Sequence, residues 1–280
     1  ANAEMMNATL QQKLASFEKM SGTKIGAAAI NTADNTYLQY RATQRFPLCS
    51  TFKVMVTAAI LQKSMAESDL LQQKIYYKKQ DFVYYSPVTE KHLADGMTVA
   101  ELSAAAMMMS DNTATNLLLK KLGGPQAVTA FARSIGDQIF RNDRFEPDMS
   151  SSIPGDIRDT STPLAMASSL RRLVLGDNLG LVQRQQLQTW LIGNTTGDKL
   201  IRASVPQGWT VGDKSGKGDY GTRNDIAIIW PLHGAPIVMA IYTTQSIKDA
   251  ESRDAVVAGV ARILLDELTQ VNSGIKANIK

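Results

Sequence analysis

Ser50 and Lys53 are the residue pair in this sequence with the clearest capacity for chemistry. The apolar segment 54–61 follows directly and has the composition of a helix, so Ser50 is expected at a helix N-terminus with Lys53 one turn further on the same face. A serine hydroxyl becomes a nucleophile when a base lies within hydrogen-bond reach, and a neutral lysine amine can be that base. The positive end of a helix dipole can stabilise developing negative charge. A helix-capping serine beside a surface lysine would give the same spacing.

Two further polar motifs stand at predicted element boundaries. Ser110, Asp111 and Asn112 separate two helical stretches; they fit a turn that caps the second helix, or a site wall where Ser110 relays a proton and Asn112 offers its amide. Lys214 and the Ser-Gly pair after it end a predicted strand. They fit a solvated hairpin rim, or a site where Lys214 and Ser215 hold an anion while Gly216 lets a substrate approach the backbone.

Residues 141–162 form a polar segment without periodicity, and Glu146 lies within it, directly before Pro147. Loops longer than about 15 residues inside a compact chain are usually functional. A carboxylate presented on such a loop can act as a general base toward water. A surface loop with ion pairs such as that of Arg144 is the structural alternative, and exposed pairs stabilise a fold little.

Composition excludes several classes of protein. The chain has 280 residues, 44% hydrophobic and 20% charged, with a net charge of +4 spread over both signs, which does not indicate nucleic-acid binding. No apolar run reaches the roughly 18 residues of a membrane helix, and residues 1–4 show no signal-peptide character, as expected if a signal peptide is absent or removed. The single cysteine, Cys49, rules out an internal disulfide, and only His92 and His233 are available, so a histidine-rich metal site is not expected.

The predicted elements give an α+β fold. Residues 10–17 are a predicted helix, 24–31 and 36–41 a strand hairpin, 208–214, 224–230 and 236–243 three antiparallel strands, and 250–268 a long helix. The segment between, about 50–195, is mainly helical in pattern. The prediction is a discontinuous subdomain, 1–45 and 195–280, in which helices flank a five-stranded antiparallel sheet, joined to an all-helical subdomain, 46–194, with the active site in the cleft between them.

The four motifs, taken together and in this order, indicate a resemblance to a known family that no single motif would establish. S-x-x-K, S-D-N, a Glu-Pro loop and K-S-G follow one another in a chain of suitable length. The sequence resembles the class A serine β-lactamases along almost its whole length and is most similar to the branch that hydrolyses oximino-cephalosporins. The stretches that support this are 46–53, 110–113, 123–125, 154–159, 190–197 and 211–216. The resemblance implies the fold shared by β-lactamases and transpeptidases.

The resemblance also implies roles in catalysis. Ser50 is expected to attack the lactam carbonyl and form an acyl-enzyme, with Lys53 and Glu146 both candidates for its activator. A water held by Glu146 is expected to remove the acyl group. Ser110 is expected to return a proton to the lactam nitrogen. The backbone N–H groups of Ser50 and Lys217 match the oxyanion hole of the family.

Substrate contacts follow from the same resemblance. Lys214, Ser215 and Arg223 are expected to hold the substrate carboxylate beside Gly216, Asn112 the side-chain amide, and Tyr85 the rim. Arg144 and Asp159 match an ion pair that clamps the Glu146 loop, and the Glu146–Pro147 bond is expected to be cis. The implied protein is a monomer in the periplasm or secreted. It uses no metal or cofactor and binds small β-lactam substrates and inhibitors, not nucleic acid or a membrane.

Three positions depart from the family pattern. Ser150 replaces the usual asparagine that helps to hold the deacylating water, and Lys217 stands where a small residue is common. Gly218 takes the place of a cysteine that some carbapenem-hydrolysing relatives pair with the residue before the nucleophile, so Cys49 has no partner.

Two alternatives share the short motifs: a β-lactam sensor that stays acylated, and a cell-wall D-Ala-D-Ala peptidase, which would not need the Glu146 loop.

Overall fold

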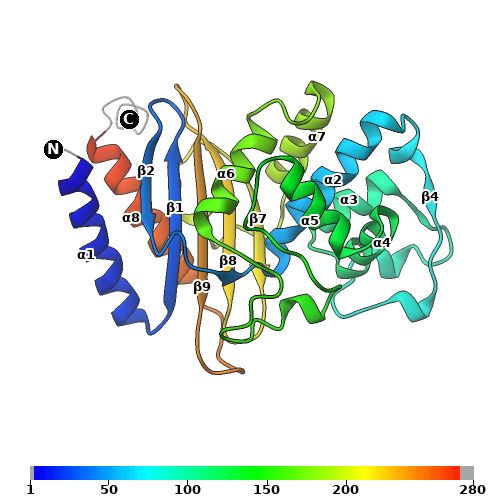
Figure 1. Cartoon of the computed structure of the whole chain (residues 1–280), viewed down its shortest axis with the longest axis horizontal. Coiled ribbons are helices and arrows are strands. Elements are labelled where there is room, and N and C mark those ends of the chain that lie inside the picture. The colour runs from blue at the N-terminus through cyan, green and yellow to red at the C-terminus, as the bar shows by residue number, and fades with distance from the viewer. Residues whose placement is uncertain (1–2, 272–280) are drawn as a thin grey trace.

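A computed structural model of the protein describes residues 3–271, with the side chains of 8–269. Its centre is one five-stranded antiparallel sheet in the order β2-β1-β9-β8-β7 (Figure 1). The strands are β1 (Lys24–Asn31), β2 (Thr36–Tyr40), β7 (Thr210–Lys217), β8 (Arg223–Trp230) and β9 (Ile237–Thr244). The predicted α+β class and the five-stranded sheet are confirmed. Residues from both ends of the sequence meet in this sheet because β1 pairs with β9.

The sheet is buried on both faces, so its central strands carry apolar residues at successive positions. Helices α1 (Ala3–Ser21) and α8 (Asp254–Val271) cover one face side by side, and Leu14, Ile241 and Leu264 lie in the core between them and the sheet (Figure 1). Helix α6 (Pro163–Val174) covers the other face, against β1, β8 and β9.

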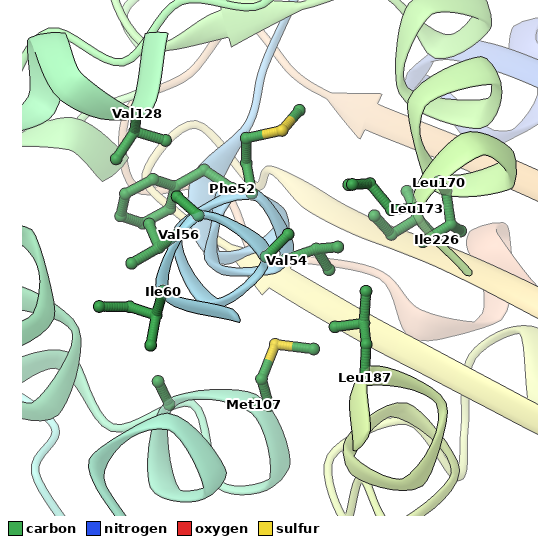
Figure 2. Close-up of a cluster of buried hydrophobic side chains, with 14 of the residues drawn as sticks. Phe52, Val54, Val56, Ile60, Met107, Val128, Leu170, Leu173, Leu187 and Ile226 are labelled. Atoms are coloured by element: carbon green, nitrogen blue, oxygen red, sulfur yellow. The ribbon is translucent and has the colours of Figure 1, made fainter. Parts of the chain in front are cut away.

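Helix α2 (Lys53–Ala66) lies at the centre of the helical part of the molecule. Figure 2 shows Phe52, Val54, Val56 and Ile60 pointing outward from it in several directions toward the surrounding elements. The helices that contact α2 are α3 (Val99–Met108), α4 (Asn112–Leu122), α5 (Pro125–Ser134) and α7 (Leu181–Ile192), and residues of α6 and β8 belong to the same core cluster (Figure 2). A helix that is apolar all round is stable only when buried, and this burial fixes the position of the residues at its N-terminus.

Local signals set many helix boundaries. Thr98 and Glu101 form the predicted capping box of α3, with side chain and backbone bonded reciprocally. Gly123 ends α4 in the left-handed conformation that glycine adopts without a steric cost. The segment 67–96 departs from the helical prediction: it contains only 3-10 turns and the short strand β4 (Lys74–Ile75), which pairs with β5 (Met97–Thr98). Its apolar residues lack the 3.6-residue period that a buried helix face needs.

The polar segment 141–162 holds little regular structure. It contains a 3-10 turn, Asp148–Ser150, and the strand β6 (Thr160–Ser161), which pairs with β3 (Phe46–Pro47) just before Ser50. None of the helices in the described range combines the length and apolar character needed to span a bilayer.

Candidate active site

Ser50 lies in a 3-10 turn, Cys49–Phe52, that runs directly into α2. Its neighbour Cys49 is fully buried and adopts a positive φ of 48°, which turns the chain sharply before the serine. Strand β7 passes close to this turn: a Cβ added at Gly216 would lie 3.1 Å from the backbone nitrogen of Ser50. A side chain at position 216 would force the strand or the serine turn to shift, so glycine favours this close approach.

Lys53 is fully buried behind Ser50 and donates three hydrogen bonds. Its Nζ lies 2.9 Å from the backbone oxygen of Ser110, 3.0 Å from Ser110 Oγ and 2.7 Å from Asn112 Oδ1. Among the described residues, it makes no hydrogen bond with Ser50. Desolvation lowers the pKa of the Lys53 amine to about 8, although the nearby charge of Glu146 opposes this shift. The neutral amine is thus accessible near neutral pH, as a general base requires.

Ser110 receives hydrogen bonds from two buried lysines. Lys214 Nζ lies 3.0 Å from Ser110 Oγ, the same oxygen that Lys53 contacts. A serine oxygen has two acceptor positions and one proton, so with both acceptor positions filled its proton can be donated elsewhere. Burial and the nearby charge of Lys53 hold the pKa of Lys214 well below its usual range. Ser110 has a positive φ of 57°, and the next residue, Asp111, accepts from the N–H of Ala114 and caps α4. The segment therefore serves as a helix cap and as a wall of the site.

Glu146 is buried with its carboxylate facing Lys53. Its Oε2 lies 3.8 Å from Lys53 Nζ and accepts no hydrogen bond from the described residues. Oε1 accepts a hydrogen bond from Ser150 Oγ at 3.0 Å. Two hydrogen bonds between the Asn116 side chain and the backbone of Glu146 hold this residue in place, and the Glu146–Pro147 bond is cis, as predicted. One buried carboxylate oxygen thus remains available to a water.

Asp159 fixes the two ends of the Glu146 loop. It is fully buried, accepts from the backbone N–H groups of Asp143 and Arg144, and accepts from Asn142 Nδ2. It also forms the predicted ion pair, with Arg144 Nε 2.8 Å from its Oδ2. The Leu48 N–H donates to its backbone oxygen, which ties this loop to the serine turn. The position of Glu146 relative to Ser50 therefore depends on Asp159.

A cavity of about 650 Å³ lies in front of these residues. Ten of the twelve predicted site residues line it, while Lys53 and Lys214 lie behind its wall and reach it through Ser110. The ten are Ser50, Tyr85, Ser110, Asn112, Glu146, Ser150, Ser215, Gly216, Lys217 and Arg223. Tyr85 is 44% exposed at the rim and has a positive φ of 67°.

Several residues that line the cavity were not predicted from the sequence. Thr196 follows α7, and its hydroxyl lies 2.7 Å from that of Ser215, so it extends the polar wall. It belongs to a polar Asn-Thr-Thr-Gly stretch after a helix, which is the only signal that the sequence offers. Asp148, Ser151 and Asp219 also line the cavity.

Two buried carboxylates lie behind Lys214 in the sheet. Asp213 accepts from Arg202 Nε at 2.8 Å and from Asn194 Nδ2 at 2.9 Å. Burial and the nearby charge of Asp213 raise the pKa of Asp225 well above its usual range. Of these two carboxyl groups, Asp225 therefore favours its protonated form behind the buried Lys214.

The chemistry available here is that of acyl transfer. A serine at the start of a buried helix, a lysine with a lowered pKa, a hydroxyl able to donate a proton and a buried carboxylate surround one cavity. Within the part of the chain that the structure describes, no three His, Cys, Asp or Glu side chains are grouped to hold a metal ion.

Comparison with known proteins assigns the chain to a family. The sequence profile of the "Beta-lactamase enzyme family" matches residues 9–268. The chain is 57% identical over 259 residues to Beta-lactamase OXY-1 of Klebsiella oxytoca, which covers 92% of this chain and 89% of the relative. It is 56% identical over 257 residues to Beta-lactamase CTX-M-8 of Citrobacter amalonaticus, covering 92% and 88%, and 55% identical over 256 residues to Beta-lactamase Toho-1 of Escherichia coli, covering 91% and 88%. The chain therefore belongs to the β-lactamase family, as a class A enzyme that hydrolyses β-lactams.

Proposed function

We propose that the protein hydrolyses penicillins and cephalosporins through an acyl-enzyme on Ser50, and that a water activated by Glu146 removes the acyl group. One observation carries the proposal: the buried carboxylate of Glu146 lies 3.8 Å from the buried Lys53 amine, beside the cavity that Ser50 lines. Two groups that can take a proton thus stand at the same serine. One can serve formation of the ester and the other its hydrolysis.

In the acylation step, Ser50 Oγ attacks the lactam carbonyl carbon and loses its proton to a base. The lowered pKa of Lys53 supports the lysine as that base, and the ion pair with Glu146 gives a route for the proton onward. The lactam C–N bond then breaks, and the nitrogen takes a proton from Ser110. The two lysine hydrogen bonds to Ser110 Oγ support this role because they leave its own proton free to be donated.

Charge on the carbonyl oxygen is stabilised by the backbone N–H groups of Ser50 and Lys217. The close approach of Gly216 to the Ser50 nitrogen supports this, because it brings the end of β7 beside the serine turn. Loss of one oxyanion-hole donor typically costs about 100- to 1,000-fold in rate.

In the deacylation step, Glu146 takes a proton from a water that attacks the ester. Its free Oε2 supports this role, and Ser150 positions the other oxygen through its 3.0 Å hydrogen bond. A positioned general base contributes roughly 100- to 10,000-fold. An ester that is not hydrolysed leaves an inhibited protein, so Glu146 is what separates a hydrolase from a β-lactam sensor or a peptidase target.

The substrate is held at both ends of the cavity. Lys214, Ser215 and Arg223 bind the ring carboxylate, while Asn112 and the Tyr85 rim receive the acylamino side chain. We propose, further, that the site lies in the cleft between a sheet subdomain, 1–45 and 195–280, and a helical subdomain, 46–194. We place the enzyme in the periplasm or outside the cell, where its substrates act on cell-wall synthesis, and as a monomer.

The test is turnover of a chromogenic cephalosporin by the purified chain, with Ser50→Ala as the control. We expect many moles of product per mole of protein, and loss of turnover in the variant. A single stoichiometric burst would identify a sensor. Cleavage of a D-Ala-D-Ala peptide without cephalosporin turnover would identify a peptidase.

A further inference from the structure

Two positive side chains face each other at the end of the sheet that borders the cavity. In the β7–β8 pair, Lys217 is the register partner of Arg223. Residues directly opposite in antiparallel strands have Cβ atoms about 4.5–5.5 Å apart on the same face, and like charges in such a pair are destabilising. An anion bound beside the two cations offsets their repulsion. A pair of this kind at a substrate cavity is therefore suited to binding an anionic group.

The two cations differ in how far they are neutralised. Arg223 Nε forms an ion pair with Asp254 Oδ1 at 2.8 Å, and its side chain is 14% exposed. Lys217 is exposed and forms no ion pair within the described residues, and both side chains line the cavity. Ser215, two residues before Lys217, points to the same face of the strand and also lines the cavity. Lys217 thus adds a positive charge, without an ion-pair partner among the described residues, beside the place proposed for the ring carboxylate.

Two negative side chains also line the cavity. Asp148 belongs to the 3-10 turn of the Glu146 loop, and Asp219 lies beyond the end of β7, with its N–H donating to the backbone oxygen of Ser150 at 3.3 Å. Both are exposed and line the cavity. The cavity is therefore lined by cations on β7 and β8, and by carboxylates on the Glu146 loop and just beyond β7.

We propose that Lys217 is a specificity-determining residue that favours β-lactams with a second negative charge on the ring side, such as cephalosporins with an acidic C3 substituent. This rests on the proposed function, since Lys214 and Ser215 must hold the ring carboxylate for Lys217 to remain available. An acid on the acylamino group, which the proposed function places at Asn112 and Tyr85, would not approach Lys217 and would gain nothing. The selectivity therefore depends on where the charge lies in the substrate, as well as on its presence.

The expected effect follows from the exposure of Lys217. Exposed charge pairs contribute about 0.2–1 kcal/mol, so loss of one reduces a rate ratio by at most about fivefold. Exposed charges are also screened by salt over a Debye length of about 10 Å at 0.1 M, so the preference should shrink as ionic strength rises. A purely structural role for Lys217 would produce no such dependence on salt.

The experiment compares three cephalosporins: one with a neutral C3 group, one with a carboxylate on C3, and one with the neutral C3 group and a carboxylate on the acylamino group. Values of kcat/KM are measured at low and high salt for the unmodified chain and for Lys217→Gln, Lys217→Arg and Lys199→Gln. Lys199 is exposed and does not line the cavity, so Lys199→Gln makes the same change in net charge away from the site.

We expect Lys217→Gln to lower the ratio of C3-acidic to neutral substrate by about three- to fivefold at low salt, and by less at high salt. Lys217→Arg and Lys199→Gln should keep the ratio. Normal turnover with an unchanged ratio in Lys217→Gln would overturn the role of Lys217 and leave the proposed function intact. An equal effect on both acidic substrates would also overturn it. Failure of the unmodified chain to turn over any of the three would overturn the proposed function together with this inference.

Discussion

Replacing Glu146 by glutamine separates the two halves of the proposed reaction. The substitution keeps the shape of the side chain but removes its charge and its ability to take a proton. The amide can still accept from Ser150, whose Oγ lies 3.0 Å from Oε1. Changes in rate can therefore be assigned to charge and basicity more than to a loss of packing.

The distance to Lys53 sets the size of the effect on acylation. Two unit charges about 4 Å apart interact by about 4 kcal/mol at an effective dielectric constant of about 20, and Glu146 Oε2 lies 3.8 Å from Lys53 Nζ. Both side chains are buried, so little screening reduces this interaction. Loss of the carboxylate removes an interaction that raises the pKa of Lys53, so this pKa falls below its value of about 8. The neutral amine then predominates at neutral pH, and Ser50 remains able to react.

For deacylation, no second base takes the place of Glu146. Lys53 is held by Ser110 and Asn112, and the base proposed for the water is gone. We expect hydrolysis of the ester to slow by roughly 100- to 10,000-fold. The acyl-enzyme should therefore accumulate to one equivalent per chain.

Intact-protein mass spectrometry after mixing Glu146→Gln with a penicillin measures this accumulation, and stopped-flow burst kinetics give both rates. Glu251→Gln, at an exposed position away from the cavity, is the matched control and should turn over normally. Undiminished turnover in Glu146→Gln would remove Glu146 from deacylation. Absence of any adduct would show that Lys53 does not suffice for acylation.

Three further predictions concern residues that support the site. Ser150→Ala removes the hydrogen bond to Glu146 Oε1, and because bonds to charged groups contribute about 1.5–3 kcal/mol, single-turnover deacylation should slow by at least about tenfold, whereas Ser150→Thr should retain most of the rate. Asp159→Asn breaks the pair with Arg144 and should lower the free energy of unfolding in urea by about 3–5 kcal/mol; a change within 0.5 kcal/mol (about the effect of an ordinary surface substitution) would contradict the clamp. The raised folded-state pKa of Asp225 means that its protonation stabilises the fold below the unfolded pKa of about 3.9, and that this stabilisation is lost as pH rises through the folded pKa. Asp225→Asn should therefore gain stability relative to the unmodified chain as pH rises across this window, and a constant difference would contradict the raised pKa of Asp225.

The sequence predicts best where strong local signals coincide with the tertiary structure. Strand β1 has its predicted bounds, Lys24–Asn31, because turn residues follow a clear apolar pattern. The prediction ends the strand after Gly208 at Lys214, but β7 continues to Lys217. Pairing with β8 maintains the strand through Gly216, whose local preference would end it. That extension is what places Lys217 opposite Arg223.

In the active site, too, the sequence predicts some features and misses others. The motifs predict which residues gather around Ser50, because each motif carries its own spacing. They do not predict that two lysines share Ser110 Oγ, nor that Thr196 and Asp219 line the cavity. Those contacts join segments 57 and 104 residues apart or lie in irregular turns, where no periodic pattern marks them.

The measurement that tests the central claim most directly is rapid-quench mass spectrometry of the unmodified protein with excess penicillin, followed by peptide mapping. The account predicts a penicilloyl ester on the peptide that contains Ser50, present only during turnover, with product far exceeding the amount of enzyme. The ester should disappear once the penicillin is consumed. An adduct on another residue, an adduct that persists, or turnover in Ser50→Ala would contradict the account.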